Sequence, residues 1–198
     1  MRVVGITGGI GSGKSFLSHL LTTGYGIPVY DCDSEAKRLN EESAEIRQGL
    51  SQLVGQEVYD AEGHLQKAVL AQYLFQSEDH QRQVNGIIHP VVRRDFLAWR
   101  QQQVCDIVGI ESAILLESGF ADMADILIHV TAPLALRIER AMKRDGSSAE
   151  QVEQRIRLQL DDDLRAARCH CQIINDGRDL TPQIEQALQI KRQTSTKR

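Results

Sequence analysis

The sequence is short of cysteines, aromatic residues and long hydrophobic runs. Of its 198 residues, four are cysteine and one is tryptophan. No apolar stretch approaches the roughly 20 residues that a helix needs to cross a bilayer. Glycines from Gly5 onward interrupt the N-terminus before the apolar segment of a signal peptide can form. We therefore expect a cytoplasmic protein without a membrane partner.

The cysteines do not show the paired C-x-x-C spacing of a structural zinc site. Their one cluster is Cys169-His170-Cys171, and side chains of adjacent residues rarely converge on one tetrahedral metal ion. Reduced thiols in a cytosolic enzyme explain these residues better than a disulfide framework or a zinc site does.

An excess of positive charge is also missing, because the net charge is −4. No broad basic field is expected, so nucleic acid is not expected as a partner. The guanine-reading pattern N-K-x-D of GTP-switch proteins is absent, and Asp60-x-x-Gly63 resembles a switch motif only by chance. With 41% hydrophobic and 25% charged residues, the composition is that of an ordinary globular protein with one core and an inserted subdomain.

The strongest pattern that is present is residues 8–15, Gly-Gly-Ile-Gly-Ser-Gly-Lys-Ser, which fits G-x-x-x-x-G-K-[ST]. It follows an apolar run at 3–7 and precedes an amphipathic helix beginning at Phe16, the context that a phosphate-binding loop requires. Glycines let the backbone approach a polyphosphate, and the helix dipole adds partial positive charge. Lys14 supplies a full charge, and the hydroxyl of Ser15 a magnesium ligand. A chance match in a glycine-rich turn is the alternative, and the strand and helix around the loop disfavour it.

Five short apolar runs alternate with helical patterns along the chain. The runs lie at 3–7, 27–30, 106–110, 126–130 and 171–174. This alternation predicts a five-stranded parallel sheet with right-handed crossovers and helices on both faces. The expected fold is therefore a P-loop NTPase-like three-layer α/β/α arrangement.

Residues 34–103 interrupt this alternation with helical stretches at 44–54, 67–75 and 84–99. His89-Pro90 is expected to interrupt the longest of these helices, because proline lacks an N–H donor and disfavours helical geometry in the residue before it. The region is predicted to be a helical insertion.

Further along, Pro133 is expected to open a helix. Ser147 to Glu150 matches the capping box S-x-x-E and predicts a charged helix running to about residue 167. The expected organisation is a nucleotide-binding core of residues 1–33 and 104–190, with a lid around 140–165. The insertion 34–103 would bind the acceptor, and the tail 191–198 would be frayed.

Phosphoryl transfer also needs cations for the moving group. Arg137, Arg140 and Arg144 fall on one helical face at spacings of three and four. They form either a solvated surface paired with Asp145 or Glu139, or a lid that closes over phosphates. We favour the lid, with Arg140 and Arg144 as its arginines.

Carboxylates follow two of the predicted strands. Asp33 can orient an acceptor hydroxyl as general base, or it can cap a helix beginning at Ser34, and Asp31 competes for the base role. Glu111 is the candidate for the magnesium side of the site, with Glu117 as a second possibility. The alternative for Glu111 is an acid that merely ends a strand.

Four motifs occur in order: residues 7–15, Asp31-Cys32-Asp33, the run 85–90 (Asn-Gly-Ile-Ile-His-Pro) and Asn175-Asp176-Gly177. In these motifs, from residue 1 to about 190, the chain resembles the bacterial dephospho-CoA kinase family. These are P-loop kinases of the nucleoside-monophosphate-kinase type. The resemblance implies that ATP phosphorylates the ribose 3'-hydroxyl of dephospho-CoA, giving coenzyme A and ADP in the last step of coenzyme A biosynthesis.

The resemblance also implies roles for individual residues, and we expect ATP and Mg²⁺ to be used. Lys14, Asp33 and Arg140 would be catalytic, while Asp33 and His89 would bind the acceptor. Ser15 and Glu111 would hold the metal. ATP would contact Gly11, Ser12, Gly13, Lys14, Ser15, Phe16, Arg144, Asn175 and Gly177.

The chain departs from the family pattern at three places. Phe16 stands where threonine is frequent, and Glu111-Ser112-Ala113 begins a segment that the family usually writes D-x-P. Cys169-His170 replaces an Ala-Asp pair.

Two other functions stay open: a kinase of another small acceptor, such as a nucleoside monophosphate or shikimate, and a regulator that binds nucleotide without transfer. Asp33 together with Arg140 favours a kinase, because a pure binder needs neither.

Overall fold

The computed structural model describes residues 1–190, and the chain divides into two compact units. One consists of Met1–Asp31 and Val104–Arg198, the other of Cys32–Gln103. The predicted frayed tail, 191–198, lies outside the described residues.

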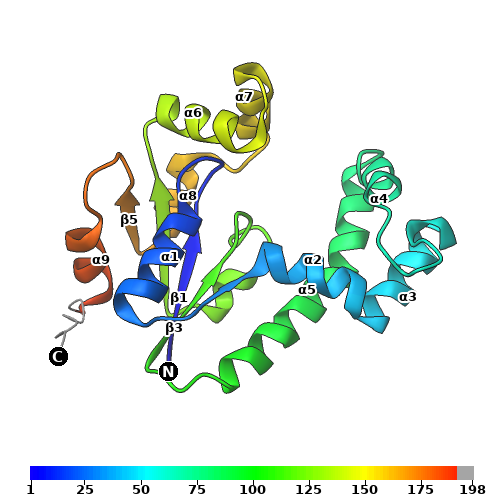
Figure 1. Cartoon of the computed structure of the whole chain (residues 1–198), viewed down its shortest axis with the longest axis horizontal. Helices are drawn as coiled ribbons and strands as arrows, with labels where there is room; N and C mark the ends of the chain where they lie inside the picture. Colours follow the sequence, from blue (N-terminus) through cyan, green and yellow to red (C-terminus); the bar gives the residue numbers. More distant parts are fainter. Residues whose placement is uncertain (191–198) are drawn as a thin grey trace. The chain divides into compact units, whose positions relative to one another are not determined.

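The first unit contains one sheet of five parallel strands in the order β2-β3-β1-β4-β5 (Figure 1). This confirms the predicted five-stranded parallel α/β fold. β1 lies in the middle, covered on both faces, which explains why its sequence is apolar rather than alternating. The strands are β1 (Arg2–Thr7), β2 (Val29–Asp31), β3 (Ile107–Glu111), β4 (Ile126–Thr131) and β5 (Cys171–Ile174).

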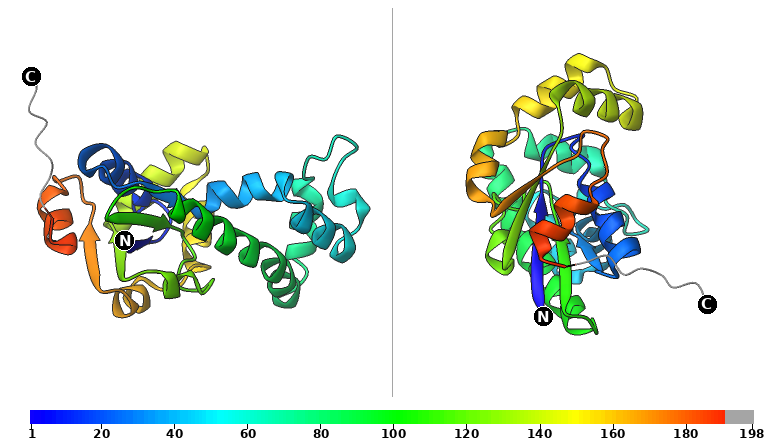
Figure 2. Two further views of the ribbon diagram at one scale, coloured as in Figure 1. Left: turned by 90° about the horizontal axis from the view of Figure 1, so that it is seen from below. Right: turned by 90° about the vertical axis from the view of Figure 1, so that its left-hand side faces the viewer.

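Helices cover both faces of this sheet. α1 and α9 lie side by side on one face, and α8 lies on the other, as Figure 2 shows in its right-hand view. α6 and α7 pack against each other. The elements are α1 (Lys14–Tyr25), η2 (Phe120–Met123), α6 (Leu134–Asp145), α7 (Ala149–Arg157), α8 (Asp162–Arg168) and α9 (Thr181–Leu188).

The main hydrophobic core lies between the sheet and the α1–α9 layer. Leu17 and Leu21 of α1 are fully buried against Ile6 of β1 and Val130 of β4, and Leu188 of α9 completes the layer. Burying one such side chain contributes about 1.5–3 kcal/mol. The first helix is therefore held firmly, and with it the loop that enters it.

The second unit is helical, and its longest helix is α5, with 24 residues. α2, α3 and α5 pack against one another, and α4 packs on α5. Within the part of the chain that is described, no helix is both long and apolar enough to span a membrane. The elements are α2 (Cys32–Glu42), α3 (Ala44–Leu53), η1 (Gln56–Val58), α4 (Lys67–Leu74) and α5 (Glu78–Gln101).

The prediction that His89-Pro90 interrupts the longest helix is wrong, because α5 runs through both residues. A proline inside a helix costs about 3 kcal/mol. Val84, before the proline, is buried, and so is Phe96 after it, so tertiary packing on both sides holds the helix together.

The predicted capping box is displaced by one residue. Ser148, not Ser147, caps α7: its hydroxyl accepts a hydrogen bond from the Gln151 N–H at 3.3 Å, and the Gln151 side chain accepts one from the Ser148 N–H at 3.0 Å. The expected long helix is two helices, because the Asp161 carboxylate caps α8 by accepting from Asp163 N at 2.8 Å.

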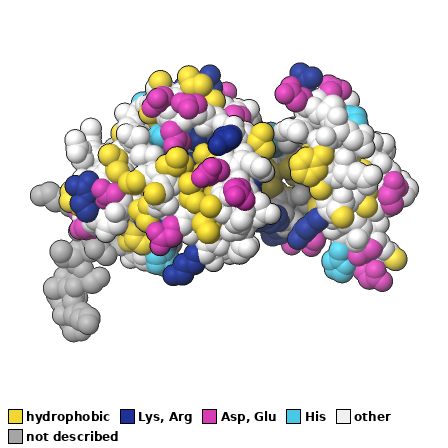
Figure 3. Space-filling model, turned by 90° about the horizontal axis from the view of Figure 1, so that it is seen from above, with side chains coloured by type: hydrophobic (Ala, Val, Ile, Leu, Met, Phe, Trp, Pro, Cys, Tyr) yellow, Lys and Arg dark blue, Asp and Glu magenta, His cyan; other side chains and the backbone are white. Residues whose placement is uncertain are grey.

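Charged side chains of both signs are interspersed on the face drawn in Figure 3. Among the described residues, charged side chains also form ion pairs along or between neighbouring helices, such as Arg38 with Glu35, Glu42 and Asp95 in the second unit. Side chains paired in this way belong to the solvated faces of helices, and they do not create a concentrated field of one sign.

Candidate active site

The phosphate-binding loop connects the central strand β1 to α1. Gly11 and Gly13 have φ angles of 73° and 92°, a region that residues with a Cβ rarely adopt. Gly13 is the N-cap of α1 and provides no side-chain hydrogen bond to the first turn. The helix dipole and its first N–H groups are thus left for an anion.

Three side chains from the distant C-terminal half hold this loop by its backbone. Arg137 Nε donates to the carbonyl oxygen of Ile10 at 2.9 Å, and the N–H of Ile10 donates to Gln159 Oε1 at 2.8 Å. Asn175 Nδ2 donates to the carbonyl oxygen of Ser12 at 3.1 Å. The shape of the loop is therefore set by the protein before any ligand arrives.

These contacts also explain why the loop is rich in glycine. A Cβ at Gly9 would lie 2.0 Å from Arg137 Nη2, and one at Gly11 would lie 2.1 Å from the Arg137 backbone oxygen. A Cβ at Gly13 would lie 2.0 Å from Asn175 Nδ2. The glycines therefore leave room for Arg137 and Asn175, which pack against the loop, as well as for phosphate.

Lys14 lies inside the loop it belongs to. Its Nζ donates to the carbonyl oxygen of Gly8 at 3.0 Å, and its charge acts on the carboxylate of Glu111. The predicted role of Lys14, to supply a full positive charge to bound phosphate, stays a prediction.

Two serines of α1 share the carboxylate of Glu111. The Ser15 hydroxyl donates to Oε1 at 3.0 Å and the Ser18 hydroxyl donates to Oε2 at 2.5 Å. Glu111 is 5% exposed, and burial raises its pKa, against the opposing effects of the two hydroxyls and Lys14. Ser18 was missed from the sequence, although its spacing of three from Ser15 puts both hydroxyls on one helical face.

Oxygen ligands of this kind suit magnesium. Mg²⁺ prefers carboxylate and hydroxyl oxygens and is completed by phosphate oxygens and water. Ser15 and Glu111 supply such oxygens at the mouth of the loop. Within residues 1–190, no group of three or more His, Cys, Asp or Glu side chains could hold a metal ion on its own.

The cluster Cys169-His170-Cys171 has a structural role instead. His170 Nδ1 accepts a hydrogen bond from the N–H of Leu127 at 3.0 Å. Burial raises the pKa of the Cys169 thiol to about 11 and also raises that of Cys171, so both stay protonated at neutral pH. All four cysteines are free thiols.

The three arginines of α6 have different surroundings. Arg137 is 4% exposed and turns toward the loop, although the sequence interpretation preferred the other two. Arg140 donates to the backbone oxygen of Asn175 at 3.0 Å and to its Oδ1 at 3.3 Å. Arg144 is exposed and pairs with Asp145 at 2.7 Å, the contact expected for a solvated surface.

Arg140 and Arg144 nevertheless border the loop. They line a cavity of about 210 Å³ whose other walls come from the loop, the start of α1 and Ala141 of α6. The wall residues, which include four predicted to contact ATP besides Lys14, are Gly11, Gly13, Lys14, Ser15, Phe16 and Ala141.

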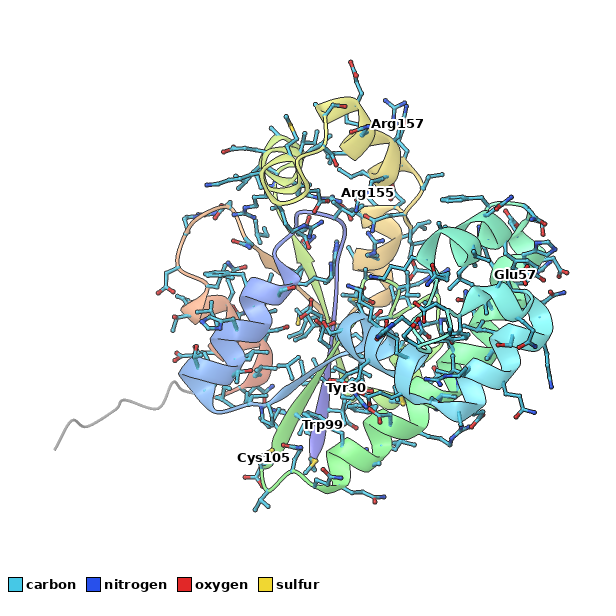
Figure 4. The ribbon with its side chains drawn as sticks, turned by 45° about the vertical axis from the view of Figure 1, so that its right-hand side comes forward. Tyr30, Glu57, Trp99, Cys105, Arg155 and Arg157 are labelled. Carbon is cyan, nitrogen blue, oxygen red and sulfur yellow. The ribbon has the colours of Figure 1, made fainter. Side chains whose placement is uncertain are left out.

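Asp145 joins α6 to α7. It accepts from Arg144 and, at 2.7 Å, from Arg155 of α7, and these two guanidinium groups hold its pKa well below its usual range. Figure 4 shows Arg155 and Arg157 on α7. The region predicted as a lid is thus two paired helices and the α7–α8 connection, not one long helix.

The remaining predicted residues lie elsewhere. Asp33 stands in the first turn of α2, which begins at Cys32, so it does not cap a helix starting at Ser34. His89 is half-buried in α5, where burial lowers its pKa. Both belong to the second unit.

Two alternatives and one turn residue are also placed. Asp31 ends β2 and lies in register with Glu111. Oε1 of Glu117 lies 3.9 Å from Nη2 of Arg165. The carboxylate that accepts a hydrogen bond from Ser15 at the loop is Glu111, not Glu117. Gly177 has a φ of 100° and open space beside it, typical of a turn.

Comparisons with known proteins agree with this geometry. A model of the dephospho-CoA kinase family matches residues 2–180. A dephospho-CoA kinase of Bacteroides fragilis strain YCH46 is 53% identical over 183 residues, covering 91% of this chain and 88% of that protein.

Solved structures show the same fold. TT1252 from Thermus thermophilus has a TM-score of 0.83 at 30% identity, covering 95% of this chain and 96% of that one. Shikimate kinase from Acinetobacter baumannii, in complex with shikimate, has a TM-score of 0.56 at 17% identity over 96% and 92% of the two chains, a likeness of fold alone. The family match and the 53% relative together confirm the resemblance found in the sequence: the chain belongs to the dephospho-CoA kinase family.

Proposed function

We propose that this chain transfers the γ-phosphoryl group of ATP to the ribose 3'-hydroxyl of dephospho-CoA, giving coenzyme A and ADP. The observation that carries the proposal is the loop of residues 8–15, whose helix N-terminus is uncapped beside Lys14 and the Ser15–Glu111 pair, in a chain of this family. Such a transfer depends mainly on positioning and charge neutralisation.

The donor side lies in the first unit. The backbone of residues 11–16 and the Lys14 ammonium bind the ATP phosphates. Arg140 and Arg144, which line the adjoining cavity, neutralise the charge on the transferred group. Asn175 and Gly177 lie on the adenine side. This assignment is supported by the hydrogen bond from Arg140 to Asn175 and by the one from Asn175 to Ser12 of the loop.

Ser15 and Glu111 would hold magnesium, because their oxygens fit it. When bound, the ion would neutralise phosphate charge. The protein's own part is to place these two oxygens at the end of β3 and the start of α1.

The acceptor side is assigned to the predicted insertion, residues 34–103, together with Asp33 directly before it. Asp33 is the general base, and His89 contributes to binding the acceptor. Asp33 lies two residues after Asp31 in the chain. Asp31 ends β2 and is in register with Glu111, which supports this role. We assign the protein to the cytoplasm, which its four free thiols support.

The test is an acceptor panel. Purified protein is incubated with ATP, Mg²⁺ and dephospho-CoA, shikimate or a nucleoside monophosphate, and ADP and product mass are followed. Of these acceptors, we expect only dephospho-CoA to give a phosphorylated product, modified at its 3'-hydroxyl. No product from dephospho-CoA together with product from another acceptor would overturn the assignment, and Lys14→Ala serves as the inactive control.

A further inference from the structure

A buried charged cluster lies between the sheet and α8, outside the cavity beside the loop. Its members are His129 of β4, Arg137 of α6, and Asp162 and Arg165 of α8. His129 is fully buried and the two arginines are 4% and 1% exposed, whereas the Asp162 side chain that joins them is 35% exposed. Buried guanidinium groups are costly unless a carboxylate pairs with them, so this cluster requires an explanation.

Asp162 connects all the other members. Its Oδ2 accepts from Arg137 Nη1, its Oδ1 accepts from Arg165 Nη1 at 3.0 Å, and Oδ1 lies 3.5 Å from His129 Nε2. These neighbours lower the pKa of Asp162 to about 2. The next carboxylate, Glu117, lies 3.9 Å from Arg165. Asp162 is thus the main counter-charge of two buried arginines.

The Arg137 guanidinium has a second contact that matters for ligand binding. While Nη1 donates to Asp162, Nε of the same planar group donates to the carbonyl oxygen of Ile10 in the phosphate-binding loop. Because the guanidinium is rigid and planar, fixing one nitrogen aims the other. Without a partner for Nη1, the side chain regains rotamer freedom, and ordering it again when the ligand binds lowers the affinity.

The residue Ile10 is held at both of its backbone polar groups. Its N–H donates to Gln159, three residues before Asp162 on the connection between α7 and α8. The short segment 159–162 therefore acts on the backbone of Ile10 at two points. Gln159 bonds its N–H directly, and Asp162 acts on its carbonyl oxygen through Arg137.

We propose that Asp162 is a positioning residue for nucleotide binding, which acts through Arg137 on Ile10 and so holds the loop in its phosphate-binding shape. The proposal rests on the proposed function only in taking ATP as the ligand of the loop. A purely structural role of the cluster, fastening α8 to the sheet, would lower stability and leave the nucleotide affinity of the folded protein unchanged.

The test measures the Kd of ADP, with Mg²⁺, by calorimetry for Asp162→Ala, Arg137→Ala and the double variant. Each single change should raise Kd about 10-fold, which corresponds to about 1.4 kcal/mol. The double variant should bind no more weakly than Arg137→Ala, because the path from Asp162 to the loop is already cut. The KM for ATP should rise and the KM for dephospho-CoA should not.

Asp163→Ala is the matched control, because Asp163 is an exposed carboxylate in the same turn of α8. It should leave Kd within about 2-fold of the wild type. If Asp162→Ala does not fold, Asp162→Asn replaces it, since the amide keeps the size and one acceptor oxygen, and its Kd should rise about 3-fold.

Either of two results would overturn the proposal. The first is a folded Asp162 variant, with a cooperative melt, that binds ADP like the wild type. The second is a double variant whose loss is the sum of the single losses, since Asp162 would then act independently of Arg137. ADP binding is read without any acceptor, so failure of the dephospho-CoA assay would leave this result interpretable.

Discussion

Ile10 is held in the phosphate-binding loop by contacts to its backbone. Its backbone N–H and carbonyl are both bonded by side chains more than a hundred positions away, Gln159 and Arg137. The loop therefore depends on residues that carry no part of its sequence motif. Some residues at this site contribute to the stability of the fold and others to ligand affinity. Separate substitutions can distinguish the two contributions.

Glu111→Gln is expected to stabilise the fold and impair activity. Burial raises the pKa of this carboxyl, so the folded state binds the proton more tightly than the unfolded state, and stability falls as pH rises through that range. Replacing a buried carboxylate that is retained for function is expected to add about 0.5–2 kcal/mol. Thermal melts should show a higher Tm for the variant as pH rises above the ordinary Glu pKa of about 4.3, with the difference vanishing below it.

The same variant should need more magnesium for half-maximal activity, because a metal-side carboxylate is lost. Glu117→Gln is the control, since that carboxylate lies beside Arg165 and not beside Ser15. An unchanged magnesium dependence in Glu111→Gln would remove Glu111 from the metal site.

Asp33→Asn is expected to lower kcat about 100-fold or more, the range for loss of a general base. The Kd of ADP should not change, because the loop and Lys14 belong to the other unit. Steady-state kinetics and calorimetry measure the two quantities. Asp31→Asn is the comparison, and a large loss there with none in Asp33→Asn would transfer the base role to Asp31.

At the level of elements, α6 packs its first turn directly onto the phosphate-binding loop. The backbone oxygen of Arg137 occupies the space where a Cβ of Gly11 would be. Helix and loop therefore cannot separate or shift independently without losing the contact with Ile10.

Gly11→Ala should consequently weaken ADP binding and lower the Tm more than Gly26→Ala. Both glycines have positive φ, so both alanines bear the conformational cost of about 1 kcal/mol. Only at Gly11 does the new Cβ meet backbone, at 2.1 Å, whereas Gly26 has open space. Equal melting temperatures and equal Kd values for the two variants would contradict this packing.

Several elements could be predicted from the sequence, and the exceptions have physical causes. The five strands were found because each is a short apolar run bounded by turns. The continuity of α5 through Pro90 was missed, because burial of Val84 and Phe96 outweighs a local preference. The break between α7 and α8 was missed because Asp161 looks like any other acid of a charged run until it caps.

At the level of the whole molecule, the chain separates into a unit that holds the phosphate-binding loop and a helical unit. The predicted division of labour assigns ATP to the first and dephospho-CoA to the second. A ligand that binds only the folded form of one unit stabilises that unit by mass action, about 2.7 kcal/mol at 100 times its Kd.

Hydrogen exchange should therefore respond to each substrate in a different place. ADP with Mg²⁺ should slow exchange in α1 and α6, with little effect in α3 and α4. Dephospho-CoA alone should slow exchange in the second unit, around His89. Protection by ADP spread equally over both units would contradict the division.

The sequence by itself determined the family, the parallel α/β fold and the loop of residues 8–15, because these depend on local patterns: periodic burial, glycine at fixed offsets, and a lysine and a serine beside them. Only the tertiary structure decided which distant groups hold that loop. Gln159 and Asp162 have no motif of their own, and the crossovers of the sheet bring them to Ile10 and Arg137. A pairing across such a separation is a property of the packed chain, which no local pattern records.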